Sequence, residues 1–138
     1  MSVAFTGWAD VDHAIAEFQD LSVLKGTKYL TVGGGDMKGQ MTADVLKKYA
    51  VSGQKIKNAG YDAVMFDLEE IKGPHTMMIP LFAAAFAAIK KAGLGVAVTV
   101  SKCAPYQADT PIDSLEYIKA WLKDENIDFM SPELYTTG

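Results

Sequence analysis

The chain has 138 residues, of which 49% are hydrophobic and 22% charged, so it can bury one compact core and is not an intrinsically disordered protein. Its net charge is −4 and all of its 13 Lys or Arg positions are lysine, which makes nucleic acid an unfavoured partner. A single cysteine, Cys103, excludes an internal disulfide, and no apolar run reaches the roughly 18 residues of a membrane span.

The first ten residues, MSVAFTGWAD, lack the basic start and the apolar segment of a secretory signal. This favours an intracellular protein, unless a leader has been removed or the chain is part of a longer one. No linker, low-complexity segment or second domain is recognisable. We therefore expect residues 1–138 to form one domain.

Strands and helices are predicted to alternate along the whole chain. Strand-like runs begin near residues 2, 28, 61, 94 and 127. Helical patterns lie between them, over residues 10–24, 42–60, 77–93 and 114–126. Strands separated by helices of this length cannot pair as hairpins, so the five strands should be parallel with right-handed crossovers.

The predicted class is therefore α/β, with five strands and four helices. Two architectures fit this alternation: an open doubly wound sheet, or part of an eightfold barrel. A complete barrel needs roughly 250 residues, so we expect an incomplete (β/α)8 barrel or an open sheet. The outer strands of an incomplete barrel would lack partners, which predicts a homo-oligomer or a partner chain over the open edges.

The stretch YDAVMFDLEE, residues 61–70, ends a strand-like run in carboxylates. Because side chains alternate along a strand, Asp67 and Glu69 should share a face with Ala63 and Met65. The Cα atoms of Asp67 and Glu69 would lie roughly 6–7 Å apart, so ionisation of one would hold a proton on the other, as a general acid requires. The carboxyl ends of parallel strands are also where α/β proteins bind ligands.

This stretch resembles the signature of glycoside hydrolase family 18, the chitinase family, whose fourth barrel strand reads D-G-x-D-x-D-x-E. Asp62, Asp67 and Glu69 match the pattern. Ala63 replaces the glycine, and Met65 replaces the middle aspartate.

Two further segments resemble neighbouring strands of that family. LTVGGG is similar to the third-strand pattern S-x-G-G, with Thr31, Gly33 and Gly34. DFMSPELY is similar to the sixth strand, which ends in a tyrosine, here Tyr135, two residues after Glu133. The resemblance covers essentially the whole chain, as strands two to six of the barrel.

The resemblance implies hydrolysis of β-1,4 bonds next to N-acetylglucosamine by substrate-assisted catalysis, with no cofactor and no metal. Glu69 would be the general acid and base, Asp67 would orient the acetamido nitrogen, and Tyr135 would bind the acetamido oxygen. Glu133, Gly33 and Gly34 would contribute to sugar binding. Family members are often secreted. The alternative is a weak or inactive sugar-binding or structural relative, which Met65 and the short chain favour.

Other readings of the same residues remain open. Gly33, Gly35 and Gly39 suggest a dinucleotide loop but miss its spacing by one residue, and a bend for close backbone approach explains them equally. Four side chains could be assembled into a metal site, although their spacing matches no established ligand pattern: Asp67, Glu69, Glu70 and His75.

Isolated aromatic and sulfur side chains are harder to assign. Trp8, Tyr29 and Tyr106 could each stack on a sugar ring or belong to the core. Cys103 is expected to be a buried, inert thiol. Trp121 lies at helical spacing with Ile118 and Leu122, which predicts a core residue.

Overall fold

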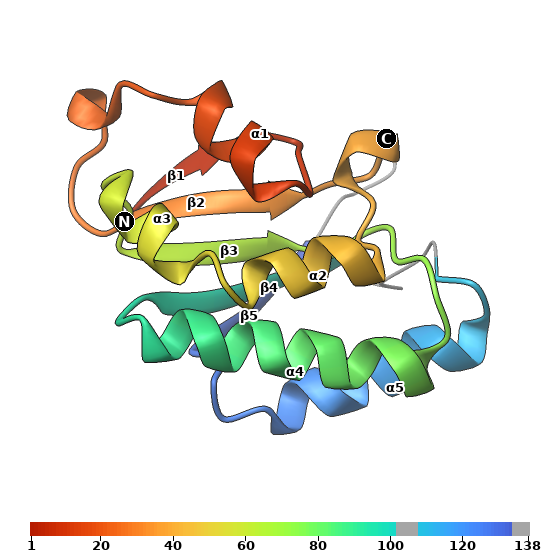
Figure 1. Cartoon of the computed structure of the whole chain (residues 1–138). Coiled ribbons are helices and arrows are strands. Elements are labelled where there is room, and N and C mark those ends of the chain that lie inside the picture. Colours follow the sequence, from red (N-terminus) through yellow and green to blue (C-terminus); the bar gives the residue numbers. More distant parts are fainter. Residues whose placement is uncertain (102–107, 134–138) are drawn as a thin grey trace.

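A computed structural model describes residues 1–101 and 108–133. Its centre is one sheet of five parallel strands that follow the order of the sequence (Figure 1). The strands are β1 (Ser2–Phe5), β2 (Lys28–Gly33), β3 (Ala63–Asp67), β4 (Gly95–Ser101) and β5 (Phe129–Glu133). The predicted α/β class with sequential parallel strands is confirmed. Because the strand order never reverses, the doubly wound alternative is wrong.

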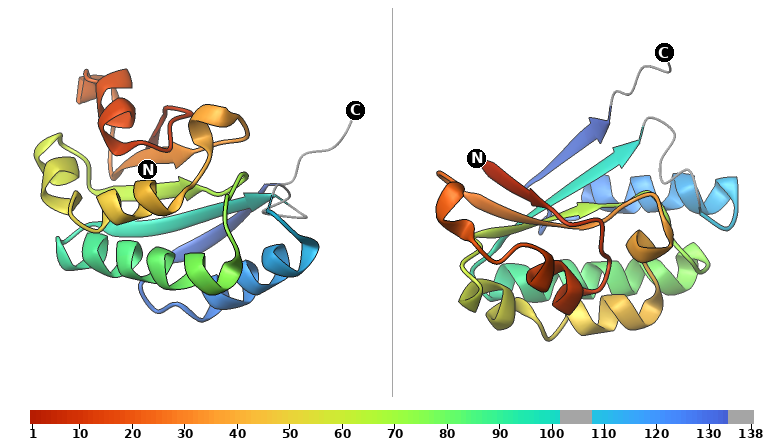
Figure 2. Two further views of the ribbon diagram at one scale, coloured as in Figure 1. Left: turned by 45° about the vertical axis from the view of Figure 1, so that its right-hand side comes forward. Right: turned by 90° about the horizontal axis from the view of Figure 1, so that it is seen from above.

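Helices cover one face of this sheet. They are α1 (Val11–Glu17), α2 (Ala43–Tyr49), α3 (Gly53–Asn58), α4 (His75–Lys91) and α5 (Pro111–Lys123), with 3-10 turns η1 (Leu21–Val23) and η2 (Met37–Gly39). Right-handed crossovers between successive strands place all connecting helices on the same side. Figure 2 shows this layer, in which α2 packs against α4 and α4 against α5. The arrangement is consistent with part of a parallel βα repeat.

The prediction of four helices is wrong, because the described residues contain five α-helices. The pattern over residues 42–60 is divided at Ser52, whose hydroxyl donates to the carbonyl of Lys48 over 2.6 Å. Gly53 then begins α3 against the end of α4, where a Cβ atom would lie 2.5 Å from that of Ala92. Position 53 therefore requires a glycine, and residues 50–52 separate the one expected helix into two short ones.

Two other helix boundaries also differ from the prediction. The first helix, expected over residues 10–24, ends at Glu17 and is followed by the separate turn η1. The last helix begins at Pro111 rather than Ser114, because the Thr110 hydroxyl accepts a hydrogen bond from the amide of Asp113 and caps it. Asp113 therefore lies inside the first turn of α5.

The hydrophobic core lies between the sheet and the helices. Alternate residues of β2, β3 and β4 point into it, and Phe66 packs edge to face on Tyr49 of α2 and Phe86 of α4. A second aromatic group, formed around Phe82, joins α4 to α5 through Tyr117 and Trp121. The prediction that Trp121 is a core residue is confirmed, since it is 2% exposed.

The opposite face of the sheet is concave, and no helix of the described residues covers it (Figure 2). Tyr29 on β2 and Phe129 on β5 are separated by two strands, or about 14 Å of flat sheet, yet their ring centroids lie 6.0 Å apart. They meet near the amino ends of the strands, above the small side chains of Ala63 and Ala97, which share this face by register. The two rings thus close the amino end of the concave face.

Among residues 1–101 and 108–133 the sheet is open at both sides, since β1 and β5 each pair with one neighbour there. Phe5 on β1 is 74% exposed. Phe129 on β5 is also partly exposed. Large apolar side chains with exposed surface therefore lie on both edge strands.

Candidate functional site

The candidate site lies at the carboxyl end of the central strand β3. Asp67 is the last residue of that strand, and the parallel register aligns it with Gly33 on β2 and Thr99 on β4. Its side chain shares the concave, helix-free face, as the alternation along the sequence predicts. The Thr99 hydroxyl donates a hydrogen bond to Asp67 Oδ1 over 3.0 Å, and this contact fixes the orientation of the carboxylate.

Gly33 and Gly34 allow two backbones to meet beside Asp67. Gly33 has a φ of +107°, and a Cβ atom there would lie 2.1 Å from the carbonyl oxygen of Asp67. The amide of Gly34 donates to the same oxygen over 3.0 Å. Close backbone approach therefore explains Gly33, and a positive φ of +126° explains Gly34. The sugar contacts that the family resemblance implies for them remain a prediction.

Glu69 lies two residues beyond β3 and is partly buried. The loop that carries it is held by backbone hydrogen bonds on both sides. Leu68 donates to the Thr99 carbonyl over 3.0 Å, and Met41 donates to the Glu70 carbonyl over 2.9 Å. Lys72 in turn donates to the Met41 carbonyl over 2.9 Å. This loop therefore has an ordered backbone that fixes where the Glu69 side chain begins.

The residue before Asp67 on the same face is Met65, which is 5% exposed. Its partner in the register is Thr31 on β2, whose hydroxyl oxygen is buried and has no hydrogen-bond partner. A buried hydroxyl without a partner is costly, and an acceptor at position 65 would lie next to it. The methionine therefore leaves a polar group unsatisfied beside the candidate carboxylate.

Two of the predicted site residues, Glu133 and Tyr135, lie at or beyond the last residue that the structure describes. Glu133 ends β5, and its backbone pairs with Ser101. The side chain of Glu133 lies outside the described residues, as do Tyr135, Cys103 and Tyr106. The structure brings Asp67, Gly33 and Thr99 together, and it places Glu69 on the adjoining loop.

Trp8 has a different setting. It lies in the connection between β1 and α1, where its ring stacks on His13 at 4.4 Å and the ammonium of Lys38 lies 5.1 Å from its centroid. These groups line a pocket of about 380 Å³ between α1, η2 and α2. Asp67 and Glu69 do not line this pocket. The sequence predicts that Trp8 contacts a sugar bound at the strand-end carboxylates. That contact remains a prediction.

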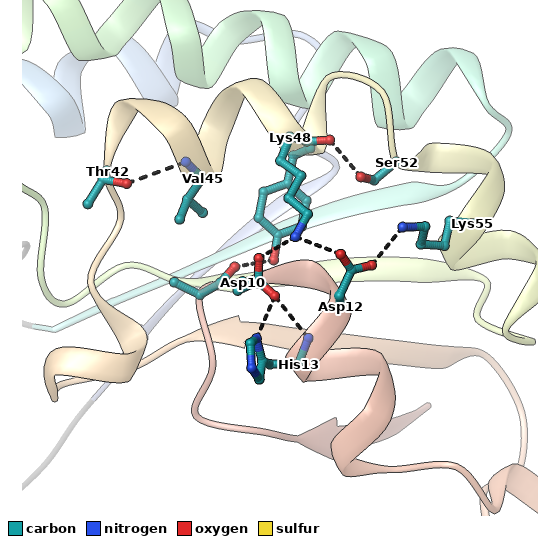
Figure 3. A network of polar contacts seen from close by, with 10 residues as sticks. Asp10, Asp12, His13, Thr42, Val45, Lys48, Ser52 and Lys55 are labelled. Atoms are coloured by element: carbon teal, nitrogen blue, oxygen red, sulfur yellow. Dashed lines mark hydrogen bonds and ion pairs between the residues drawn. The ribbon is translucent and has the colours of Figure 1, made fainter.

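The carboxylates near Trp8 are engaged in an ion-pair network that joins α1 to α2 and α3 (Figure 3). Lys48 of α2 lies 2.6 Å from both Asp10 and Asp12, and Lys55 of α3 lies 2.7 Å from Asp12. Burial acts to raise the pKa of Asp10, but hydrogen bonds from Lys48 and His13 outweigh it and hold that pKa well below the usual range. Asp10 and Asp12 therefore have a structural role, since they hold α1 against α2 and α3.

Within residues 1–101 and 108–133, no group of three or more His, Cys, Asp or Glu side chains is placed to hold a metal ion. The metal site considered from the sequence, made of Asp67, Glu69, Glu70 and His75, is therefore not formed. None of the helices in the described part of the chain is long and apolar enough to cross a membrane.

Sequence reasoning missed Thr99 as a partner of Asp67. The alternation of side chains along β4 could have predicted this partner, because residues 95, 97 and 99 share the concave face with Asp67. It also missed the contacts that α5, and Asp109 just before it, make with the segment following Glu69. These join residues 36–44 positions apart and have no signature in the local sequence.

No known protein family, curated protein or solved structure matches the chain.

Proposed function

We propose that the chain is the central part of a glycoside hydrolase similar to family 18, which cleaves β-1,4 linkages of N-acetylglucosamine. The observation that carries the proposal is the position of Asp67. It is a carboxylate on the concave face, at the carboxyl end of the central parallel strand, oriented by Thr99. Barrel enzymes place their catalytic groups at this end of their strands. Glu69 follows on a loop with a fixed backbone.

In the proposed reaction Glu69 donates its proton to the oxygen of the leaving sugar as the glycosidic bond breaks. The acetamido oxygen of the substrate attacks the anomeric carbon and forms a cyclic oxazolinium ion. Asp67 accepts a hydrogen bond from the acetamido nitrogen and stabilises the positive charge, while Tyr135 binds the acetamido oxygen. Water then attacks the anomeric carbon and returns a proton to Glu69, so that the configuration is retained.

A second candidate is a sugar-binding relative with little or no turnover, and Met65 favours it. The side chain is buried on the same face as Asp67, so no carboxylate two residues earlier on the strand can share a proton with it. In this case the acidic strand end would bind the acetamido group without completing the proton transfers.

Either function needs more surface than five strands supply, because a sugar is contacted by loops from all around a barrel. We propose that additional strands, from a longer chain, a partner chain or a second copy, cover the open edges. The exposed Phe5 and the partly exposed Phe129 support this, since both lie on edge strands.

The proposal is tested by incubating the full native polypeptide with chitin oligosaccharides of four to six sugars. Mass spectrometry of the products should show shorter oligosaccharides, and products formed in ¹⁸O water should carry the label at the new reducing end. Calorimetry with the same oligosaccharides distinguishes the candidates. Binding with cleavage supports the hydrolase, binding without cleavage supports the sugar-binding relative, and no binding contradicts both.

A further inference from the structure

We infer that Asp113 of α5 is a positioning residue for the loop that carries Glu69. The inference rests on the proposed function, since it concerns the residue assigned as its acid. Asp113 is 6% exposed, and one of its oxygens, Oδ1, lies 2.6 Å from His75 Nδ1 and accepts from the His75 amide over 2.8 Å. One carboxylate oxygen thus contacts both the backbone and the ring of the first residue of α4.

The other oxygen of Asp113 accepts a hydrogen bond from the Thr110 hydroxyl over 2.6 Å. This bond and those from the His75 amide and ring lower the pKa of Asp113 to about 2. The carboxylate therefore remains ionised at any ordinary pH, and both of its oxygens have fixed partners. Asp113 is held firmly enough to determine the position of what it contacts.

Two further groups, one just before α5 and one on it, hold Gly73, two residues before His75, by its backbone. Asp109 Oδ2 accepts from the amide of Gly73 over 3.1 Å, and the buried Tyr117 hydroxyl donates to the carbonyl of the same glycine over 2.7 Å. We call Asp109, Asp113 and Tyr117 the α5 bracket. Together they satisfy both backbone groups of Gly73 and the amide of His75.

The opposite end of the segment is fixed by the sheet side of the fold. Asp67 and Leu68 are bound to β2 and β4, and Met41 exchanges backbone hydrogen bonds with Glu70 and Lys72. Glu69 thus lies between two fixed points: the strand end on one side and the α5 bracket on the other. Catalysis by a positioned acid is sensitive to displacements of about 1 Å, which can cost roughly 10²-fold. Loss of the bracket should therefore reduce turnover although none of its members touches the substrate.

The test uses Asp113→Ala, which removes both acceptor oxygens, and Asp113→Asn, which keeps one. Glu116→Ala is the matched control, because Glu116 lies one turn further along α5 and pairs with Lys119 at the surface. Residue-resolved amide hydrogen exchange is measured by NMR in the full chain. The rates at Lys72 and His75 are read relative to that of the buried Val98 in strand β4, so that a change in global stability cancels.

Asp113→Ala should accelerate relative exchange by at least tenfold at Lys72 as well as at His75, and Asp113→Asn should restore part of the protection. With a chitin oligosaccharide as substrate, kcat should fall by about tenfold or more while KM stays within about twofold. Glu116→Ala should change neither. If acceleration is confined to His75, Asp113 is only a helix cap and the inference is wrong.

Two outcomes need separate handling. If Asp113→Ala does not fold, Asp109→Ala makes the same measurement, because it frees the Gly73 amide and leaves the Asp113 contacts intact. If the parent chain does not hydrolyse the oligosaccharide, the proposed function fails, while the exchange rates at Lys72 still decide whether α5 positions the loop.

Discussion

The Thr99 hydroxyl on β4 donates a hydrogen bond to Asp67 Oδ1 at the end of β3, over 3.0 Å. The two residues are paired in the register, so the contact joins neighbouring strands at their carboxyl ends. It holds the carboxylate on the concave face, where Asp67 is partly exposed.

Replacing Thr99 with Val should remove this hydrogen bond and keep the shape of the side chain. Hydrogen bonds to charged groups contribute about 1.5–3 kcal/mol, and because Asp67 is partly exposed we expect the lower part of that range. Hydrolysis of a chitin oligosaccharide should fall about tenfold, with no large change in thermal stability. Thr76→Val, at an exposed position of α4, is the control. Unchanged kinetics in Thr99→Val would mean that Asp67 does not need this partner.

Met65→Asp should increase turnover. The new carboxylate would accept a hydrogen bond from the buried hydroxyl of Thr31, which has no partner, and would lie two residues before Asp67 on the same face. Two carboxylates at this spacing share a proton, so the pH profile of kcat should shift as well. Met65→Leu keeps an apolar side chain and should change neither quantity. If Met65→Asp folds and hydrolyses no faster than the parent, the missing aspartate is not what limits turnover.

Gly33→Ala should destabilise the protein. The φ of +107° is costly for a side chain, by roughly 1–3 kcal/mol, and the Cβ atom would also collide with the Asp67 carbonyl oxygen. Gly35 is exposed and has no positive φ, so Gly35→Ala should be nearly neutral. Urea unfolding of the two variants makes the comparison, and equal midpoints would show that the two backbones do not meet as described.

Asp113→Asn should reduce stability in a pH-dependent manner. The pKa of Asp113 is about 2 in the folded protein and 3.8 in its ordinary state, so the carboxylate binds fewer protons when folded. Its contribution to stability is therefore complete above about pH 4 and is lost as the pH falls towards 2. Urea unfolding should show the variant less stable than the parent at pH 7, with the difference disappearing near pH 2. A difference that is constant across this range would contradict the lowered pKa.

The sequence allowed the strand positions, their parallel order and the face occupied by Asp67 to be predicted, because these follow from alternation and from the length of the connections. The division of the second helix could not be predicted, since the buried residues Leu46, Tyr49 and Ile56 keep helical spacing across the break. The bracket formed by Asp109, Asp113 and Tyr117 was likewise inaccessible. It depends on how α5 lies against a loop about 40 residues earlier in the chain, whereas local patterns report only on nearby residues.

The most direct test of the proposed function is the turnover of Glu69→Gln on a chitin oligosaccharide, in the full native polypeptide. The amide keeps the shape of the side chain and removes the proton, so turnover should fall by about 10²- to 10⁴-fold while calorimetry shows largely unchanged binding of the sugar. Glu70→Gln, on the next residue of the same loop, should retain most of the activity. Turnover of Glu69→Gln within a few-fold of the parent would show that Glu69 is not the acid and would contradict the proposed mechanism.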